Sequence, residues 1–241
     1  YTIPYRSYYS KNIRNLFMAG RNISTSRMGL ASTRIIGCCA IGGEAVGIAA
    51  SLCVKHSCEP RELMAHIGEL QQKILKEDGY LPGFINEDEA DLARKATVSA
   101  TYFLPGGEPE QVAQGISRKM GEKENGWVTR AGESLTLALD GAHTVSQVRM
   151  TFESNFAYPI RVTMAPLRQQ QQRIGVPPEL VRDYGVELLL DGKVVLEKVV
   201  SGNFQRLSVC DLEPTLADSV RITIHATNGD EKVVVHEVRV Y

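Results

Sequence analysis

The fold of the first part of the chain is decided by residues 15–50, which read NLFMAGRNISTSRMGLASTRIIGCCAIGGEAVGIAA. The apolar run at 15–20 ends in glycine, which is typical of a buried parallel strand. A polar turn follows at 21–26, and residues 32–34 lead into a helix that we expect to continue to about His56. This helix is rich in glycine, and each glycine lowers helix stability by about 1 kcal/mol. We therefore expect a buried helix that closely approaches a neighbouring strand or a ligand.

This order of strand, turn and helix can hold an anionic ligand. The first N–H groups of a helix and its dipole favour negative charge, and small residues let a flat ring approach the backbone. Arg21 and Arg34 can pair with a phosphate or with a reduced, anionic ring. The alternative is a helix that only packs tightly on a sheet, and the local pattern leaves both interpretations open.

Composition and charge exclude several classes of protein. The chain has 241 residues, 43% hydrophobic and 23% charged, which is typical of a globular protein and not of a disordered or collagen-like chain. Its net charge of −1 argues against a nucleic-acid partner, because such proteins need a basic face. The basic residues are concentrated early, with seven against one acid in residues 1–58. This start therefore favours contact with an anion or an acidic surface.

Cysteine usage and hydropathy give two further expectations. The five cysteines are odd in number, include adjacent Cys38 and Cys39, and form no C-x-x-C motif, so we expect buried free thiols.

The most membrane-like segment, residues 38–54, contains Glu44 and is shorter than the roughly 20 apolar residues of a spanning helix. We therefore expect no membrane partner. The chain starts at Tyr1 without a signal-peptide pattern, which says little about its location.

Residues 59–96 are predicted to be a helical linker. Pro60 suits the first turn of a helix, and Asp78-Gly79 suits its end. Between them lies one apolar stripe, formed by Leu63, Ile67, Leu70 and Ile74. The later acidic residues are expected to be solvated rather than an acid/base pair, and they are Glu87, Asp88, Glu89 and Asp91.

From Thr97 onward the hydrophobic period changes to two, which predicts short β-strands separated by turns such as Asp140-Gly141. The expected strands are 135–139, 145–152, 160–164, 186–190, 194–200, 220–225 and 233–240. Many short strands with turn signals indicate an all-β sandwich or barrel. We therefore predict an α+β chain with a domain boundary near residue 96, giving domains at 1–96 and 97–241.

Four ordered motifs in the first domain carry a resemblance to a known family. They are IPYR at 3–6, NIRNLFMAGRNIS at 12–24, LASTR at 30–34 and GEAVGIAA at 43–50. Together they closely resemble the C-terminal end of the FAD-binding domain in FAD-dependent oxidoreductases, over about residues 1–95. The resemblance implies a helical remnant of an α/β FAD-binding domain. It also implies flavin contacts at Ala19, Gly20, Arg21, Asn22, Ser32, Thr33, Arg34 and Ala40.

Two departures from this family limit what the resemblance implies. The G-x-G-x-x-G unit that binds the FAD pyrophosphate is absent. We therefore expect this chain to be the tail of a longer enzyme, inactive alone, with FAD bound only in the intact parent and with the missing N-terminal FAD-binding region as its partner. Arg27 stands where many relatives have histidine, so no catalytic residue is assigned.

The second domain carries another resemblance. Trp127, Arg130 and the segments 148–152, 184–187, 191–193, 202–206, 220–224 and 237–241 occur in the order seen in galactose-binding-like β-sandwiches, the jelly rolls of discoidin and type C modules. The resemblance implies a possible glycan ligand, with Trp127 as the stacking side chain, and a periplasmic or secreted location. The alternative is that Trp127 belongs to the core.

The remaining polar residues of this domain have plainer interpretations. Arginines that alternate with apolar residues are expected to be solvated or in structural ion pairs, and these are Arg149, Arg206, Arg221 and Arg239. No transition-metal site is expected, because His143, His225 and His236 lack a ligand-like spacing with cysteine. A structural Ca²⁺ is common in the resembling fold family and stays open.

Three functions remain possible. The first is an enzyme fragment whose parent passes a hydride to FAD and then to an acceptor, with the cofactor supplying the chemistry. The second is a carbohydrate-binding accessory module of a polysaccharide-degrading enzyme of the xanthan-lyase-like kind. The third is a structural role, in which the sandwich supports the flavin domain or forms an oligomer contact. No G-x-S-x-G, H-E-x-x-H or P-loop motif adds a fourth.

Overall fold

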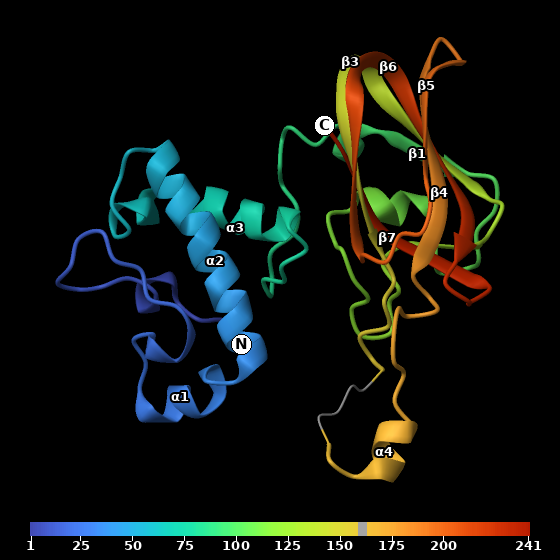
Figure 1. Cartoon of the computed structure of the whole chain (residues 1–241). Helices are drawn as coiled ribbons and strands as arrows, with labels where there is room; N and C mark the ends of the chain where they lie inside the picture. Colours follow the sequence, from blue (N-terminus) through green and yellow to red (C-terminus); the bar gives the residue numbers. More distant parts are fainter. Residues whose placement is uncertain (159–162) are drawn as a thin grey trace. The chain divides into compact units, whose positions relative to one another are not determined.

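The computed structural model describes residues 1–158 and 163–241 and divides the chain into two compact units (Figure 1). The first unit is Tyr1–Glu87 and the second is Asp88–Tyr241. The division falls before the predicted boundary near residue 96, because Asp91 binds the last strand of the second unit. Its Oδ1 accepts a hydrogen bond from the backbone amide of Val240 at 2.9 Å. Each unit is described by itself below.

The first unit is built from short helical segments around one long helix. Its elements are η1 (Tyr5–Ser7), η2 (Gly20–Asn22), α1 (Arg27–Thr33), α2 (Ile36–Lys55), η3 (Glu62–His66) and α3 (Ile67–Lys76). The predicted glycine-rich helix is confirmed as α2. A separate short helix, α1, precedes it and begins where Ser26 Oγ accepts from the amide of Gly29 at 3.1 Å.

The prediction of a buried strand at residues 15–20 is wrong for this chain. Phe17 forms an isolated bridge with Tyr9, and the amide of Met18 donates to the carbonyl of Tyr8 at 2.7 Å. No β-strand forms within Tyr1–Glu87, all of which the structure describes. A parallel strand needs a sheet to join, and this unit supplies none.

The core of the first unit confirms the predicted apolar stripe. Leu63, Leu70 and Ile74 are buried and Ile67 packs against them. The end of α3 is fixed by a C-terminal motif in which the amide of Gly79 donates to the carbonyl of Ile74 at 2.9 Å. Burial of each large aliphatic side chain contributes about 1.5–3 kcal/mol.

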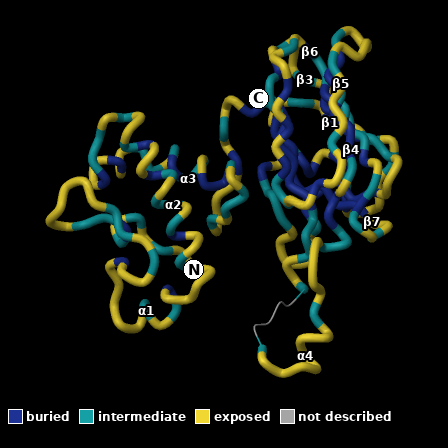
Figure 2. The backbone as a smooth tube through the Cα atoms, viewed as in Figure 1, coloured by how far each residue is buried: buried dark blue, intermediate teal, exposed yellow. Residues whose placement is uncertain are grey.

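The prediction that α2 is a buried helix is wrong for this chain. Only Gly42, Ala49 and Leu52 are buried among its residues, and Figure 2 shows most of the helix as intermediate or exposed. By length and composition alone α2 could cross a membrane, with a mean hydropathy of 1.7 and only 17% of that apolar window buried. An apolar helix is therefore largely uncovered within the described part of the chain.

The second unit is dominated by antiparallel strands. Its elements are η4 (Leu92–Lys95), β1 (Thr97–Ala100), η5 (Pro109–Ala113), β2 (Trp127–Arg130), β3 (Ser134–Phe152), α4 (Pro166–Gln170), β4 (Val181–Leu190), β5 (Lys193–Val200), β6 (Leu207–Thr227) and β7 (Lys232–Val240). All the strand pairs are antiparallel, in the order β2-β7-β3-β6-β4-β5, and β1 also pairs with β3.

Two long strands turn this sheet into a sandwich. The first half of β3 pairs with β1 and with the later part of β6, whereas its second half pairs with β7 and with the start of β6. Register shifts between Ala138 and His143 and between Val145 and Gln147 mark where β3 bends. Figure 1 shows β3 and β6 side by side. The predicted α+β class with a β-sandwich is confirmed.

The strand predictions differ from the structure in their bounds. The expected strands at 135–139 and 145–152 are one strand, β3, and the turn predicted at Asp140-Gly141 is wrong because these residues continue that strand. The strand predicted at 160–164 lies mostly outside the described residues, and Thr163 and Met164 are irregular. The short strands β1 and β2 were not predicted.

The core of the sandwich is filled by alternate residues of the strands. Fully buried side chains include Trp127, Leu137, Phe152, Tyr184 and Ile222. The ring centroids of Phe152 and Tyr184 are 5.5 Å apart, and the phenol oxygen of Tyr184 is 2.7 Å from Ser208 Oγ. The buried aromatic hydroxyl thus has a hydrogen-bond partner, which removes the cost of burying it.

Candidate functional site

The residues predicted to contact a flavin lie on η2, on α1 and at the start of α2. Gly20 has a φ of +87°, a conformation that favours glycine at this turn. Ala19, Arg21 and Asn22 are exposed. The η2 segment packs against α2, so the structure brings this turn and the long helix together.

The predicted residues at the end of α1 form hydrogen bonds within the first unit. Thr33 is buried, and its hydroxyl donates to the carbonyl of Gly29 at 3.1 Å. The hydroxyl of Ser32 donates to the phenol oxygen of Tyr1 at 2.8 Å, and that oxygen lies 3.2 Å from Cys38 Sγ. Ser32 and Thr33 therefore position the chain that enters α2.

The N-terminus of α2 keeps its hydrogen-bonding capacity. Ile35 is the N-cap residue, and no side chain among the described residues caps this helix end. Arg34 precedes it and is exposed, as is Ala40 in the first turns. The helix dipole and the guanidinium of Arg34 are both suited to negative charge at this end.

One face of α2 is a continuous apolar stripe at helical spacing. We call it the α2 stripe, and its residues are Ile36, Ala40, Gly43, Gly47, Ala50 and Val54. Ile36 is 86% exposed and Val54 is 81% exposed. A Cβ atom built on Gly43 or Gly47 would meet nothing within 4 Å. The α2 stripe is therefore open along its length in this chain.

Gly42, by contrast, is a site of close approach. A Cβ atom there would lie 2.9 Å from Cε1 of Tyr8, whose ring is buried. The expected close contact of a glycine in α2 therefore exists, but its partner is a tyrosine ring of the same unit and not a strand.

The cysteines are free thiols in this structure, and only Cys210 is buried, whereas the other four are half-buried. Burial raises the pKa of the Cys53 thiol to about 11, and nearby Cys58 adds to the shift. The hydroxyl of Tyr5 donates to the carbonyl of Pro60 at 2.7 Å, and burial raises the pKa of that phenol as well. The Cys53 thiol and the Tyr5 phenol are therefore neutral at pH 7.

Sequence reasoning missed a cluster of metal-ligand type at the corner between α2 and α3. His56 Nε2 lies 2.7 Å from Glu69 Oε2, and the rings of His56 and His66 stack with centroids 3.9 Å apart. One ligand atom from each of the three lies within 4.8 Å of the others. No sequence motif predicts this cluster, because its members come from the end of one helix, the turn that follows and the start of a second helix.

Trp127 lies in the core of the sandwich, as the alternative interpretation held. Its side chain is fully buried, and its indole N–H donates to the carbonyl of Tyr102 at 2.9 Å. A fully buried ring has no free face for a sugar, so stacking at Trp127 does not fit this structure.

The exposed aromatic side chain with cationic neighbours is Phe156. Its ring is 65% exposed, and the guanidinium carbons of Arg206 and Arg118 lie 4.4 Å and 5.7 Å from its centroid. The guanidinium of Arg206 is held in place because it donates to the carbonyls of Phe152 and Ser117. This arrangement combines an exposed apolar ring with fixed polar groups, as sugar-binding sites do.

The other predicted arginines are mostly structural. Arg221 forms a bidentate ion pair with Glu187, with N–O distances of 2.6 Å and 2.9 Å. Arg239 pairs with Glu237 at 3.1 Å, and both are buried, as is Arg149. The prediction of ion pairs therefore holds for Arg221 and Arg239, while solvated positions do not fit Arg149 or Arg239.

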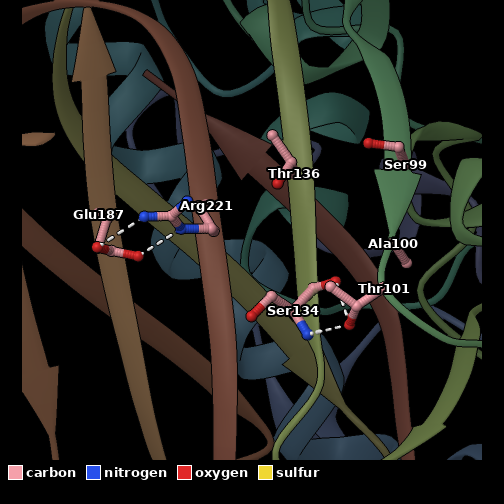
Figure 3. Close-up of a pocket in the computed structure, with 7 residues that line it drawn as sticks. All are labelled: Ser99, Ala100, Thr101, Ser134, Thr136, Glu187 and Arg221. Atoms are coloured by element: carbon pink, nitrogen blue, oxygen red, sulfur yellow. Dashed lines mark hydrogen bonds and ion pairs between the residues drawn. The ribbon is translucent and has the colours of Figure 1, made fainter. Parts of the chain in front are cut away.

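The Arg221–Glu187 pair lines a shallow pocket on the sandwich (Figure 3). The pocket has a volume of about 440 Å³ and is lined by Ser99, Ala100, Thr101, Ser134, Thr136, Glu187 and Arg221. The amide of Ser134 donates to Thr101 Oγ1 at 2.9 Å. Since Glu187 already neutralises the guanidinium, the pocket offers little attraction to an anion.

The predicted acidic linker residues separate into two groups. Glu87 and Glu89 are exposed, as expected. Asp91 is only 3% exposed, and its Oδ1 accepts from the amides of Ala93 and Val240. Asp88 Oδ2 accepts from the phenol of Tyr241 at 3.0 Å. The expectation of a fully solvated acidic run is therefore wrong for Asp91, which is a structural residue.

A family model for FAD dependent oxidoreductases matches residues 1–74. A search of curated proteins found no match. Among solved structures, the lectin domain of Lectinolysin complexed with Lewis B antigen is 15% identical, with a TM-score of 0.49, and the match covers 64% of this chain and 96% of that domain. The family 32 carbohydrate-binding module from Streptococcus pneumoniae EndoD is 19% identical, with a TM-score of 0.48 and coverages of 63% and 98%. A Streptococcus pneumoniae fucose binding module is 14% identical, with a TM-score of 0.47 and coverages of 66% and 99%.

The family match covers the same motifs that carried the sequence resemblance. The implied G-x-G-x-x-G unit is not among residues 1–74. The solved structures above are lectin and carbohydrate-binding domains. The chain thus joins a segment that matches the FAD dependent oxidoreductase family, residues 1–74, to an antiparallel β-sandwich.

Proposed function

We propose that residues 1–87 form one face of a flavin site in an FAD-dependent oxidoreductase, and that the β-sandwich is an accessory domain of that enzyme. The dinucleotide-binding part of the site would come from another polypeptide segment, because residues 1–74 lack the glycine-rich turn for the pyrophosphate. The enzyme would pass a hydride from substrate to flavin and then to an acceptor, with FAD supplying the redox chemistry.

The observation that carries this proposal is the uncovered α2 stripe within the family-matching segment. Apolar surface of this extent costs free energy in water, at about 25 cal/mol per Å². A sheet of the dinucleotide-binding part would cover it, and the small side chains would allow that sheet to come close.

The residues of this chain would then act on the flavin by position and charge. The exposed guanidiniums of Arg21 and Arg34 would face the phosphates or the anionic reduced ring. The uncapped amides at the start of α2 would supply hydrogen-bond donors to an electron-rich flavin atom. Gly20 would let the turn lie close to the flavin ring, because glycine adopts this positive φ without the strain that any other residue would have there.

The test is a substitution on the α2 stripe in the full-length protein purified from its natural source. Gly47→Leu adds a side chain where this chain leaves open space, so it should improve the helix propensity of α2 yet block the covering sheet. We expect flavin per polypeptide to fall several-fold. The matched control is Gly68→Leu on α3, where a Cβ atom also meets nothing within 4 Å, and it should retain full flavin content. Equal flavin content in both variants would contradict the proposal.

A second function is proposed for the sandwich, namely glycan binding at Phe156. The exposed ring with Arg118 and Arg206 beside it favours this function. It would place the accessory domain on a polysaccharide, in keeping with a secreted or periplasmic protein. On an oligosaccharide array, Phe156→Ala should lose binding that a Leu216→Ala control on exposed β6 retains. Absence of binding to every glycan, or binding that Phe156→Ala leaves intact, would exclude this function.

A further inference from the structure

We infer that His56, His66 and Glu69 form a binding site for a divalent transition metal of the Zn²⁺ type, which fastens the corner between α2 and α3. The proposal concerns a structural site in the first unit and does not depend on the flavin function. It revises the expectation from the sequence that the chain has no transition-metal site.

The geometry brings three donors to one point. His56 is the C-cap residue of α2, His66 is the N-cap residue of α3, and Glu69 lies in the first turn of α3. The ligand atoms of all three lie within 4.8 Å of one another. Tetrahedral zinc with bonds of about 2.0–2.1 Å needs ligand atoms roughly 3.4 Å apart, so side-chain rotations must bring the ligand atoms closer by up to about 1.4 Å.

The donor set selects the class of metal. Two imidazole nitrogens and one carboxylate oxygen suit zinc and its neighbours, whereas Ca²⁺ and Mg²⁺ take oxygen ligands almost exclusively. A set of three protein ligands leaves a fourth position for water. His56 and Glu69 are half-buried, with side chains 23% and 30% exposed, so an ion can enter from solvent.

The surroundings orient the ligands. Lys55 Nζ donates to Glu69 Oε1 at 2.7 Å, and His56 Nε2 lies 2.7 Å from Oε2, so a metal bound at Oε2 would replace the direct contact between His56 and Glu69. The rings of His56 and His66 stack with an interplanar angle of 9°, so their in-plane lone pairs run parallel and one ring must turn before both nitrogens reach a single ion. The corner itself is rigid, because Leu63 and Leu70 on either side of His66 are buried in the core. Outer contacts of this kind commonly position metal ligands.

The field at this position has contributions of both signs. His56 follows the last turn of α2, where carbonyl groups and the helix dipole give partial negative charge, whereas the ammonium of Lys55 on Glu69 Oε1 opposes a second cation. A metal bound by His56 from α2 and by Glu69 from α3 would link the two helices that form the core of the unit. The same pair without metal is an ordinary hydrogen bond at 2.7 Å, and the experiment must separate these two states.

The experiment titrates ZnCl₂ into the whole chain after treatment with a chelator and follows binding by calorimetry. We expect one zinc ion per chain, a higher Tm of the helical signal with zinc, and affinity reduced at least ten-fold in His66→Gln and in Glu69→Gln. The matched control is His143→Gln, because His143 faces Asp140 at 2.8 Å in the other unit. This control should bind zinc as the parent chain does, and circular dichroism checks that every variant is folded.

Cobalt distinguishes this site from the four thiols of the first unit. The Co²⁺ complex should show tetrahedral d–d bands without a thiolate charge-transfer band, and it should persist after the cysteines are alkylated. The proposal is overturned if no stoichiometric zinc binds, if His66→Gln and Glu69→Gln bind with the affinity of the parent chain, or if thiolate bands show that cysteines hold the metal.

Discussion

The imidazole of His236 and the carboxylate of Glu153 are joined by a contact of 3.1 Å between Nε2 and Oε2. The other ring nitrogen, Nδ1, lies 2.9 Å from the carbonyl oxygen of Asn125. Both ring nitrogens therefore lie within hydrogen-bond distance of an oxygen atom. The side chain of His236 is 1% exposed and that of Glu153 is 18% exposed, which places this contact inside the sandwich.

This pair predicts acid sensitivity of the sandwich. Burial alone would raise the pKa of Glu153, but the hydrogen bond and charge of His236 lower that pKa to about 2. The unfolded value is near 4.5, so the stabilisation is complete above that pH and is lost as the pH falls toward 2. We expect a loss of about 2–3 kcal/mol of unfolding free energy over this range from this group.

The measurement is urea unfolding between pH 5 and pH 2, followed by the fluorescence of Trp127, the single tryptophan, which is buried in the sandwich. Glu153→Gln should flatten the acid limb of the stability profile, whereas Glu197→Gln on exposed β5 should leave it unchanged. An acid limb of equal steepness in Glu153→Gln and the parent chain would refute this role.

The buried carboxylate of Asp91 is also expected to stabilise the sandwich. Its carboxylate accepts from the amides of Val240 and Ala93, and hydrogen bonds to a charged group contribute about 1.5–3 kcal/mol. Asp91→Ala should lower the unfolding free energy by about 2–3 kcal/mol, as measured by Trp127 fluorescence in urea. Glu89→Ala, at an exposed neighbouring position, should change it by less than about 0.5 kcal/mol. A similar loss in both variants would show that Asp91 has no special role.

Two adjacent glycines of α2 predict opposite effects in the isolated chain. Gly42→Ala places a methyl group against the buried ring of Tyr8, so we expect destabilisation of about 1 kcal/mol. Gly43→Ala meets open space, so we expect stabilisation of up to about 1 kcal/mol from helix propensity. Thermal unfolding followed by far-ultraviolet circular dichroism checks both. A higher Tm in Gly42→Ala than in Gly43→Ala would contradict the close contact with Tyr8.

The hydrophobic periodicity of the sequence correctly predicted those helices and strands whose stabilising contacts lie within this chain. The stripe of Leu63, Leu70 and Ile74 lies in the core of the first unit, and the alternating runs of the second domain form strands. The run at 15–20 failed as a strand, because its pattern specifies burial in a sheet that the described residues do not contain. The apolar sequence of α2 likewise predicted a buried helix. Within this chain the α2 stripe is exposed.

The sites were less predictable than the elements. The motif-based residues Gly20, Arg21 and Arg34 do lie at a turn and a helix start, where a ligand can reach them. The contacts of His56 with His66 and Glu69 depend on the angle between two helices, which no local pattern encodes. A single tryptophan was an obvious candidate for stacking, but strand pairing directs Trp127 inward, and the exposed aromatic Phe156 lies in a turn after β3.

The most direct test of the central claim is the flavin content of two polypeptides, measured by visible absorbance after purification with FAD present. We expect about one FAD per chain in the full-length protein from its natural source. We expect none retained by residues 1–241 alone, because the α2 stripe is uncovered and residues 1–74 lack the glycine-rich turn for the pyrophosphate. A full-length protein without flavin, or stoichiometric FAD held by residues 1–241, would contradict this claim.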